Sequence, residues 1–84
     1  MGQKDKLIRR LKSTPRDFTF EEAETLLNYL SFKKSNKGKT SGSRIIFTSD
    51  THGSILLHKP HPRKELLEYQ VRQLCDKLEQ EGLI

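Results

Sequence analysis

The sequence has little cysteine, no long apolar run and no export signal. Cys75 is the only cysteine among the 84 residues, so no disulfide can form within the chain, and the residue is expected in the core rather than as a nucleophile. Apolar residues make up 32% of the chain, and no stretch approaches the roughly 18 consecutive apolar residues that a membrane-spanning helix needs. The N-terminal sequence MGQKDKLIRR lacks the apolar core of a signal peptide. These absences predict a cytoplasmic protein without a membrane segment.

Acidic residues are missing from one segment and scarce in another. Residues 32–49 carry five lysines or arginines and no Asp or Glu, and residues 1–16 carry six basic residues against Asp5 alone. The whole chain has a net charge of +5. A basic domain favours an anionic partner, although charged runs are also common on ordinary solvated surfaces. The two basic segments would form one binding surface only if the fold brought them together.

Metal-binding and cofactor-binding patterns are also lacking. No group of Asp and Glu residues has the spacing of metal ligands. His58 and His61 are close enough in sequence to share a metal ion, but the sequence offers no further ligands beside them. We therefore expect neither a metal nor a cofactor.

Apolar periodicity predicts three helices. The first covers residues 4–13 and ends before Pro15, which disfavours a helical residue in front of it. The second begins after Thr19, and Glu22 three residues later completes the sequence pattern of a capping box. The longest covers residues 63–82. Its apolar stripe consists of Leu67, Val71, Leu74 and Leu78, with Gly82 as the C-cap.

Three strands are expected between the second and third helices. Residues 31–36 form a short strand, residues 43–49 contain the β-branched and aromatic run RIIF, and residues 54–59 return after the turn sequence DTHG. Side-chain alternation gives the middle strand two different faces. One face carries Arg44, Ile46 and Thr48, and the other carries Ile45 and Phe47.

This order of elements predicts one α+β domain over residues 1–84. Its two layers would be a three-stranded antiparallel sheet and a set of helices on one face of that sheet, in the order α-α-β-β-β-α. Large apolar side chains supply the expected core. The core candidates are Phe18, Phe20, Phe32 and Phe47, and Tyr29 and Tyr69 are also expected to pack.

Short motifs in this order resemble a known protein family. GS at positions 42–43 leads into the middle strand, PHP at 60–62 follows the next strand, and KEL at 64–66 and EGL at 81–83 belong to the last helix. Together with the order of elements, these motifs resemble the HicA-type toxins of bacterial type II toxin–antitoxin systems, and the first helix looks like an extension of the family's usual start. The resemblance covers nearly the whole chain. It implies a double-stranded-RNA-binding-like fold, cleavage of mRNA, and a HicB-type antitoxin as the protein partner.

One position departs from the family pattern. Family members commonly enter the middle strand with Gly-Ser-His, whose histidine is the usual catalytic residue, whereas Arg44 follows Ser43 in this chain. The family also often has a histidine shortly before Lys-Glu-Leu, and His61 lies near that position. A catalytic member with this sequence would therefore use His61 or His58.

The same residues suit RNA chemistry on physical grounds. RNA cleavage without a metal needs a base for the 2′-hydroxyl, an acid for the leaving oxygen, and cations beside the phosphate. Histidine suits the first two roles because it titrates near neutrality, and arginine can grip two phosphate oxygens at once. The expected RNA contacts are Lys37, Lys39, Thr40, Ser41, Ser43, Arg44 and Lys59. His52 lies in the turn, and we expect it to be exposed and inert.

Three functions stay open at this point. The chain could be a ribonuclease toxin that uses His61 or His58, with Arg44 on phosphate. It could be a noncatalytic RNA-binding module of the same fold, whose affinity would depend strongly on salt. It could also be a protein-interaction domain whose basic face meets an acidic partner such as an antitoxin.

Overall fold

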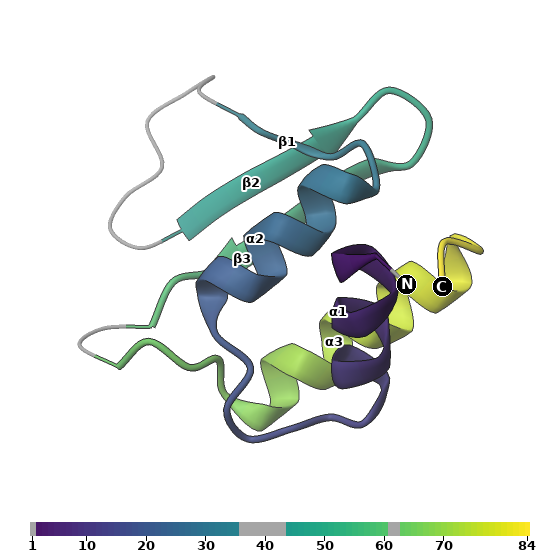
Figure 1. Ribbon diagram of the computed structural model, residues 1–84. Helices are drawn as coiled ribbons and strands as arrows, with labels where there is room; N and C mark the ends of the chain where they lie inside the picture. The colour runs from purple at the N-terminus through teal and green to yellow at the C-terminus, as the bar shows by residue number, and fades with distance from the viewer. Residues whose placement is uncertain (1, 36–43, 61–62) are drawn as a thin grey trace.

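Three helices and three strands occur in residues 2–35, 44–60 and 63–84, the parts of the chain that the structure describes (Figure 1). The structure is a computed structural model. The elements are α1 (Gln3–Lys12), α2 (Phe20–Tyr29), β1 (Lys33–Lys34), β2 (Arg44–Ser49), β3 (Gly53–His58) and α3 (Glu68–Gln80). Their order confirms the predicted α+β fold. None of the helices in the described parts combines the length and hydrophobicity needed to span a bilayer.

β2 is the central strand of an antiparallel sheet with the order β1-β2-β3. The hairpin of β2 and β3 pairs Ser49 with Gly53 at its closed end and Arg44 with His58 at its open end. Gly53 has a φ of +80°, a conformation that glycine adopts at little cost after a short turn. The predicted turn and returning strand are therefore confirmed, with the strand beginning one residue earlier than expected.

β1 is shorter than the sequence predicts. It covers only Lys33–Lys34 and pairs with β2. Phe32 does not join it because its N–H donates to the carbonyl of Leu27 in α2 at 2.9 Å. The turn that ends α2 thus takes up the first residues of the predicted strand, while Asn36 at its far end lies outside the described residues.

One face of the sheet is packed against helices and the other is not. Phe47 of β2 and Leu57 of β3 are buried, whereas their neighbours Thr48 and His58 are exposed, as alternation along a strand requires. The ring centroid of Phe47 lies 6.2 Å from that of Phe20 in α2. All four phenylalanines are buried, as predicted, whereas Tyr29 is 46% exposed and is not the packing residue that the sequence predicts. The face that carries Arg44, Ile46, Thr48, Ser54, Leu56 and His58 is called the outer face below.

α1 packs on α2 and α3. Leu7 and Leu11 on one side of α1 are buried in the core, which explains the apolar spacing seen in the sequence. α1 belongs to the helical layer, as Figure 1 shows, so its basic residues, among them Arg9, Arg10 and Lys12, are part of that layer. Two basic residues of the sheet, Lys33 and Arg44, lie on the outer face with Thr48 and His58 as their cross-strand partners, whereas Lys34 pairs with Phe47 of the other face.

The predicted capping box at the start of α2 is confirmed. The backbone N–H of Glu22 donates to the Thr19 hydroxyl at 3.1 Å, and the N–H of Thr19 donates to the Glu22 carboxylate at 3.1 Å. Both interactions satisfy backbone donors that a helix N-terminus would otherwise leave without partners.

α3 begins later than the sequence predicts. Residues 64–66 pair in extended form with residues 18–20: the N–H of Phe20 donates to the Lys64 carbonyl at 3.0 Å, and the N–H of Leu66 donates to the Phe18 carbonyl at 2.8 Å. This pairing holds residues 64–66 in an extended conformation, which excludes them from the helix. It also buries Leu66, which is 1% exposed. The sequence put Leu67 in the helical stripe, which is wrong, because that residue precedes the helix and is 39% exposed.

The end of α3 lies close to the predicted one, although Glu81 takes the C-cap position that the sequence assigns to Gly82. The helix ends at Gln80, Glu81 is the C-cap residue, and Gly82 follows with a φ of +72°. A glycine in this left-handed conformation is the usual way to stop a helix.

Candidate functional site

Arg44 and His58 are direct cross-strand partners on the outer face. Both side chains are exposed. The sequence marked them separately, one as a phosphate contact and one as a catalytic histidine. The register of the hairpin brings them together.

The backbone pattern shows that these two side chains are close neighbours. The carbonyl of Ile46 accepts a hydrogen bond from the N–H of Ser35 at 2.7 Å, so Ile46 points its backbone groups away from β3. The direction of the backbone N–H and C=O groups repeats every second residue, so those of Arg44 also point away from β3. Its pairing with His58 is then of the type without mutual backbone hydrogen bonds, in which the two Cα atoms are only about 4.5 Å apart and side chains approach most closely.

The rest of the outer face changes in character along the strands. Next to the Arg44–His58 pair lie Ile46 and Leu56, which face each other across the hairpin. Leu56 is 52% exposed although it is a large apolar residue. The far end carries hydroxyl groups from Thr48 opposite Ser54. No acidic side chain belongs to this face within the described strands, so it can meet an anion without local repulsion.

Lys59 lies on the other side of the sheet from His58. Its Nζ is 5.8 Å from the centroid of the Phe20 ring in α2. This follows from alternation, since successive residues of an extended segment point to opposite faces. Arg44, His58 and Lys59 therefore do not form one cluster, although all three are exposed.

Six of the predicted site residues lie outside the described residues. They are Lys37, Lys39, Thr40, Ser41, Ser43 and His61. Their expected roles stay predictions.

Gln70 is a residue at the site that sequence reasoning missed. It is the one buried polar side chain in the described parts of the chain, and its Nε2 donates to the His58 carbonyl at 3.0 Å. Its Oε1 accepts from the N–H of Leu67 at 2.9 Å, which caps the start of α3. Gln70 thus ties the end of β3 to α3 and holds the backbone at His58. The sequence did contain a signal for this role: Gln70 is a polar residue four positions before Leu74, so it lies on the apolar face of the helix.

His52 is not the exposed residue that the sequence predicts. Its ring is half-buried, and Nδ1 lies 3.1 Å from the carboxylate of Glu81 at the end of α3. The ring centroid is 6.3 Å from that of Phe32. The hairpin turn therefore packs against the C-terminal end of α3, which the sequence could not show. His52 is remote from the Arg44–His58 pair, at the opposite end of the hairpin.

Cys75 is a buried residue of the core, as predicted. Its thiol donates to the carboxylate of Glu79 at 3.6 Å. Burial and the neighbouring charge of Glu79 raise the pKa of the Cys75 thiol above its ordinary value. Both effects disfavour the thiolate, which is the reactive form.

Cys75 should consequently be slow to alkylate. At a mildly alkaline pH, iodoacetamide should modify the folded chain about tenfold or more slowly than the same chain in denaturant, because folding both buries the thiol and lowers its thiolate fraction. Mass spectrometry over time measures the two rates. Equal rates in the folded and denatured chain would contradict this description of Cys75.

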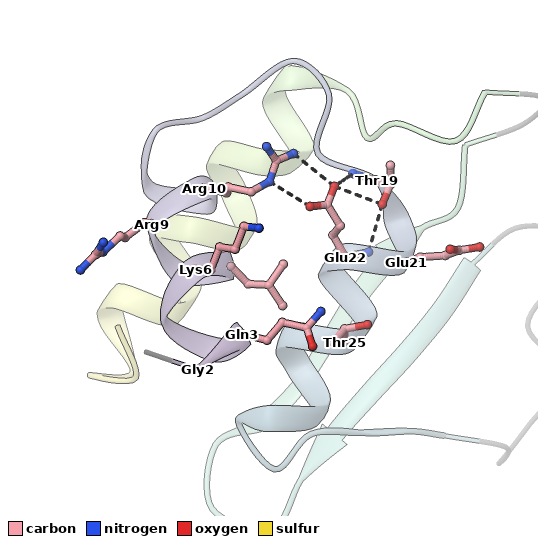
Figure 2. A pocket seen from close by; sticks show the side chains of 10 residues that line it. Gly2, Gln3, Lys6, Arg9, Arg10, Thr19, Glu21, Glu22 and Thr25 are labelled. Atoms are coloured by element: carbon pink, nitrogen blue, oxygen red, sulfur yellow. Dashed lines mark hydrogen bonds and ion pairs between the residues drawn. The ribbon is translucent and has the colours of Figure 1, made fainter.

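A cavity among the described residues lies elsewhere, between α1 and α2 (Figure 2). It has a volume of about 800 Å³. At one side of the cavity, Arg10 of α1 forms an ion pair with Glu22 of α2, with 2.9 Å between Nε and Oε2. Its Nη2 also lies 3.3 Å from the carboxylate of Asp17. The hydrogen bond to Glu22 raises the pKa of Arg10 above its ordinary value. The described residues among those predicted for RNA contact or catalysis, Arg44, His58 and Lys59, do not line this cavity.

Potential metal ligands are dispersed in the described parts of the chain. No group of three His, Cys, Asp or Glu residues within residues 2–35, 44–60 and 63–84 could hold a metal ion.

A family comparison covers the part of the chain that builds this face. The family model described as the HicA toxin of bacterial toxin–antitoxin matches residues 20–83, which include α2, the sheet and α3. α1 precedes the matched region. No curated protein and no solved structure matches the chain. Because the match spans well over half of the sequence, the chain belongs to the HicA toxin family of bacterial toxin–antitoxin systems.

Proposed function

We propose that this toxin binds mRNA on the outer face of its sheet and cleaves it without a metal. The observation that carries the proposal is the direct pairing of Arg44 with His58 on an exposed face. Arg44, a cation that can hold phosphate, then lies beside His58, a side chain that can donate or accept a proton. The neighbouring side chains of that face are apolar or carry hydroxyl groups, so nothing there repels a phosphate.

The chemistry needs only the RNA and two proton-transfer groups. A base removes the proton of a ribose 2′-hydroxyl, the resulting oxygen attacks the adjacent phosphorus, and the bond from phosphorus to the 5′ oxygen breaks. An acid protonates that leaving oxygen, which leaves a 2′,3′-cyclic phosphate and a 5′-hydroxyl. His58 suits one proton transfer and His61 the other, because histidine exists in both protonation states near neutral pH. Arg44 holds the charged phosphate oxygens.

RNA binding would extend beyond this pair. Lysines and hydroxyl side chains reach phosphates and 2′-hydroxyls, which are the features that proteins read on double-stranded RNA. The contacts proposed on these grounds are Lys37, Lys39, Thr40, Ser41 and Ser43, whereas Lys59, which the sequence also predicts as a contact, lies on the other side of the sheet. A HicB-type antitoxin would neutralise the toxin as its protein partner.

One observation favours a second candidate function, that of a noncatalytic RNA-binding module. Arg44 stands where the family commonly has its catalytic histidine. Arginine stays protonated at physiological pH, so it can bind phosphate but cannot act as a base. In that case the outer face would bind RNA and leave it intact.

The role of Arg44 is testable through RNA affinity. Arg44→Ala should weaken RNA binding about tenfold and lower the salt slope of the binding constant by about one, because one phosphate contact is lost. Arg72→Ala is the matched control, since Arg72 is exposed on α3 and pairs with Glu68. Titration of a fluorescent RNA at several salt concentrations measures both quantities. An unchanged affinity for Arg44→Ala would contradict RNA binding through the outer face.

The fate of the RNA separates the candidate functions. The purified chain is incubated with mRNA in the presence of a metal chelator, and induced cells are followed for growth and mRNA integrity. Cleavage with cyclic phosphate ends supports the ribonuclease. Binding that leaves the RNA intact supports the noncatalytic module, and absence of both supports a domain that binds only protein.

A further inference from the structure

Among the described strands, β3 lies at the edge of the sheet and has a strand partner on one side only. The alternation described above directs the backbone N–H and C=O groups of Ser54, Leu56 and His58 away from β2. The His58 carbonyl on this edge is occupied by Gln70 at 3.0 Å. In the described parts of the chain, no other residue hydrogen-bonds to the backbone of Ser54 or Leu56 on this side. Two residues of β3 thus offer an open pairing edge.

A groove runs beside this edge, between β3 and α3. It has a volume of about 240 Å³. We call it the β3–α3 groove, and its lining residues from α3 are Tyr69, Gln70, Gln73, Leu74 and Lys77. Tyr69 is 56% exposed, so it is not the packing residue that the sequence predicts. An exposed tyrosine and the exposed Leu56 therefore flank a groove that nothing in the described chain fills.

The charge of the groove selects the kind of partner. Its lining contains no carboxylate, and it carries His58 and Lys77. Lys77 has one partner, the carboxylate of Glu81 at 3.7 Å. Arg44 adds a positive charge next to His58. An acidic segment would therefore be attracted, whereas a basic one would meet the net charge of +5 of the whole chain.

We propose that the β3–α3 groove receives an extended acidic segment of the antitoxin, which pairs with Ser54 and Leu56 as a fourth strand of the sheet. Strand addition supplies main-chain hydrogen bonds for affinity, and alternate side chains supply specificity. Side chains on one side of the segment enter the groove against Tyr69 and Leu74, so they should be apolar. Those on the other side continue the outer face beside Leu56, where acidic groups meet Arg44.

This docking site also implies a mechanism of neutralisation, which rests on the proposed function. A segment paired along β3 lies beside His58, so its acidic side chains would meet Arg44 and compete with the phosphates of RNA. Docking itself is inferred from the edge, the groove and the charges, and needs no RNA.

The docking test uses the full chain labelled with nitrogen-15 and a short synthetic peptide that alternates valine with glutamate. The peptide should bind saturably, shift the amide resonances of β3 and of α3 near Tyr69, and slow hydrogen exchange at Ser54 and Leu56. A matched peptide methylated on the backbone nitrogens that face β3 should bind about tenfold or more weakly, because it cannot donate to the edge. A valine–lysine peptide should also bind more weakly.

Two variants locate the site. Tyr69→Ala should weaken peptide binding about tenfold, since an aromatic wall is removed. Tyr29→Ala is its control, because Tyr29 is exposed on α2 and bonds to Gln3 at 3.2 Å. The proposal is wrong if the valine–glutamate peptide does not bind, if the methylated peptide binds equally well, or if the shifts gather at α1. No RNA is present, so a failure here leaves the cleavage result standing, and a failure of cleavage leaves this result standing.

Discussion

Replacing His58 with alanine should slow RNA cleavage by about 10²- to 10⁴-fold, the usual loss when a proton-transfer group is removed. RNA affinity should change little, because Arg44 and the lysines that hold phosphate remain. The physical reason is the position of His58, which is exposed and directly opposite Arg44 on the outer face. Single-turnover cleavage and RNA titration with the same RNA measure the two effects separately.

His52→Ala is the matched control for this experiment. His52 is also a histidine of the hairpin, but it faces Glu81 at the end of α3 and lies at the other end of the strands. Its removal should leave cleavage within about twofold of the wild type once the folded fraction is accounted for, because surface changes away from a site have small effects. His61→Ala is measured beside it, and a large loss there would assign the second proton transfer. Full activity in both His58→Ala and His61→Ala would refute a histidine-dependent ribonuclease.

Replacing Phe47 with alanine should destabilise the fold by about 3–5 kcal/mol. Phe47 is 0% exposed on the central strand, and its ring packs 6.2 Å from that of Phe20. Removing the ring loses its burial and leaves a cavity between sheet and helices. A domain of this size has a total stability of about 5–10 kcal/mol, so the variant should be close to unfolding at body temperature.

Thermal unfolding followed by circular dichroism measures this loss. The midpoint should fall by more than about 12 °C, since each kcal/mol corresponds to about 4–8 °C in a small domain. Leu56→Ala is the control on the neighbouring strand, because Leu56 is 52% exposed on the outer face and should cost less than about 1 kcal/mol. Similar losses in the two variants would mean that the sheet does not have one covered and one uncovered face.

The sequence by itself determined those features that depend on neighbouring residues. The apolar spacing of Leu7 and Leu11 predicts α1, and the Thr19–Glu22 pattern predicts the start of α2. Both signals depend only on residues three or four positions apart in the chain. Alternation in β2 separates Phe47 from Arg44 without any knowledge of the partner strand. The order of elements follows from these local signals.

Tertiary structure decided the features that depend on distant partners. α3 begins late because residues 64–66 pair with residues 18–20, a contact that no local pattern encodes. His52 is half-buried because the turn meets the end of α3, and Gln70 is buried because it bonds to His58 across the groove. Arg44 and His58 become a pair only through the register of the hairpin. The candidate site needed the structure for the same reason, since it is made by residues from two strands and a helix that the chain brings together only on folding.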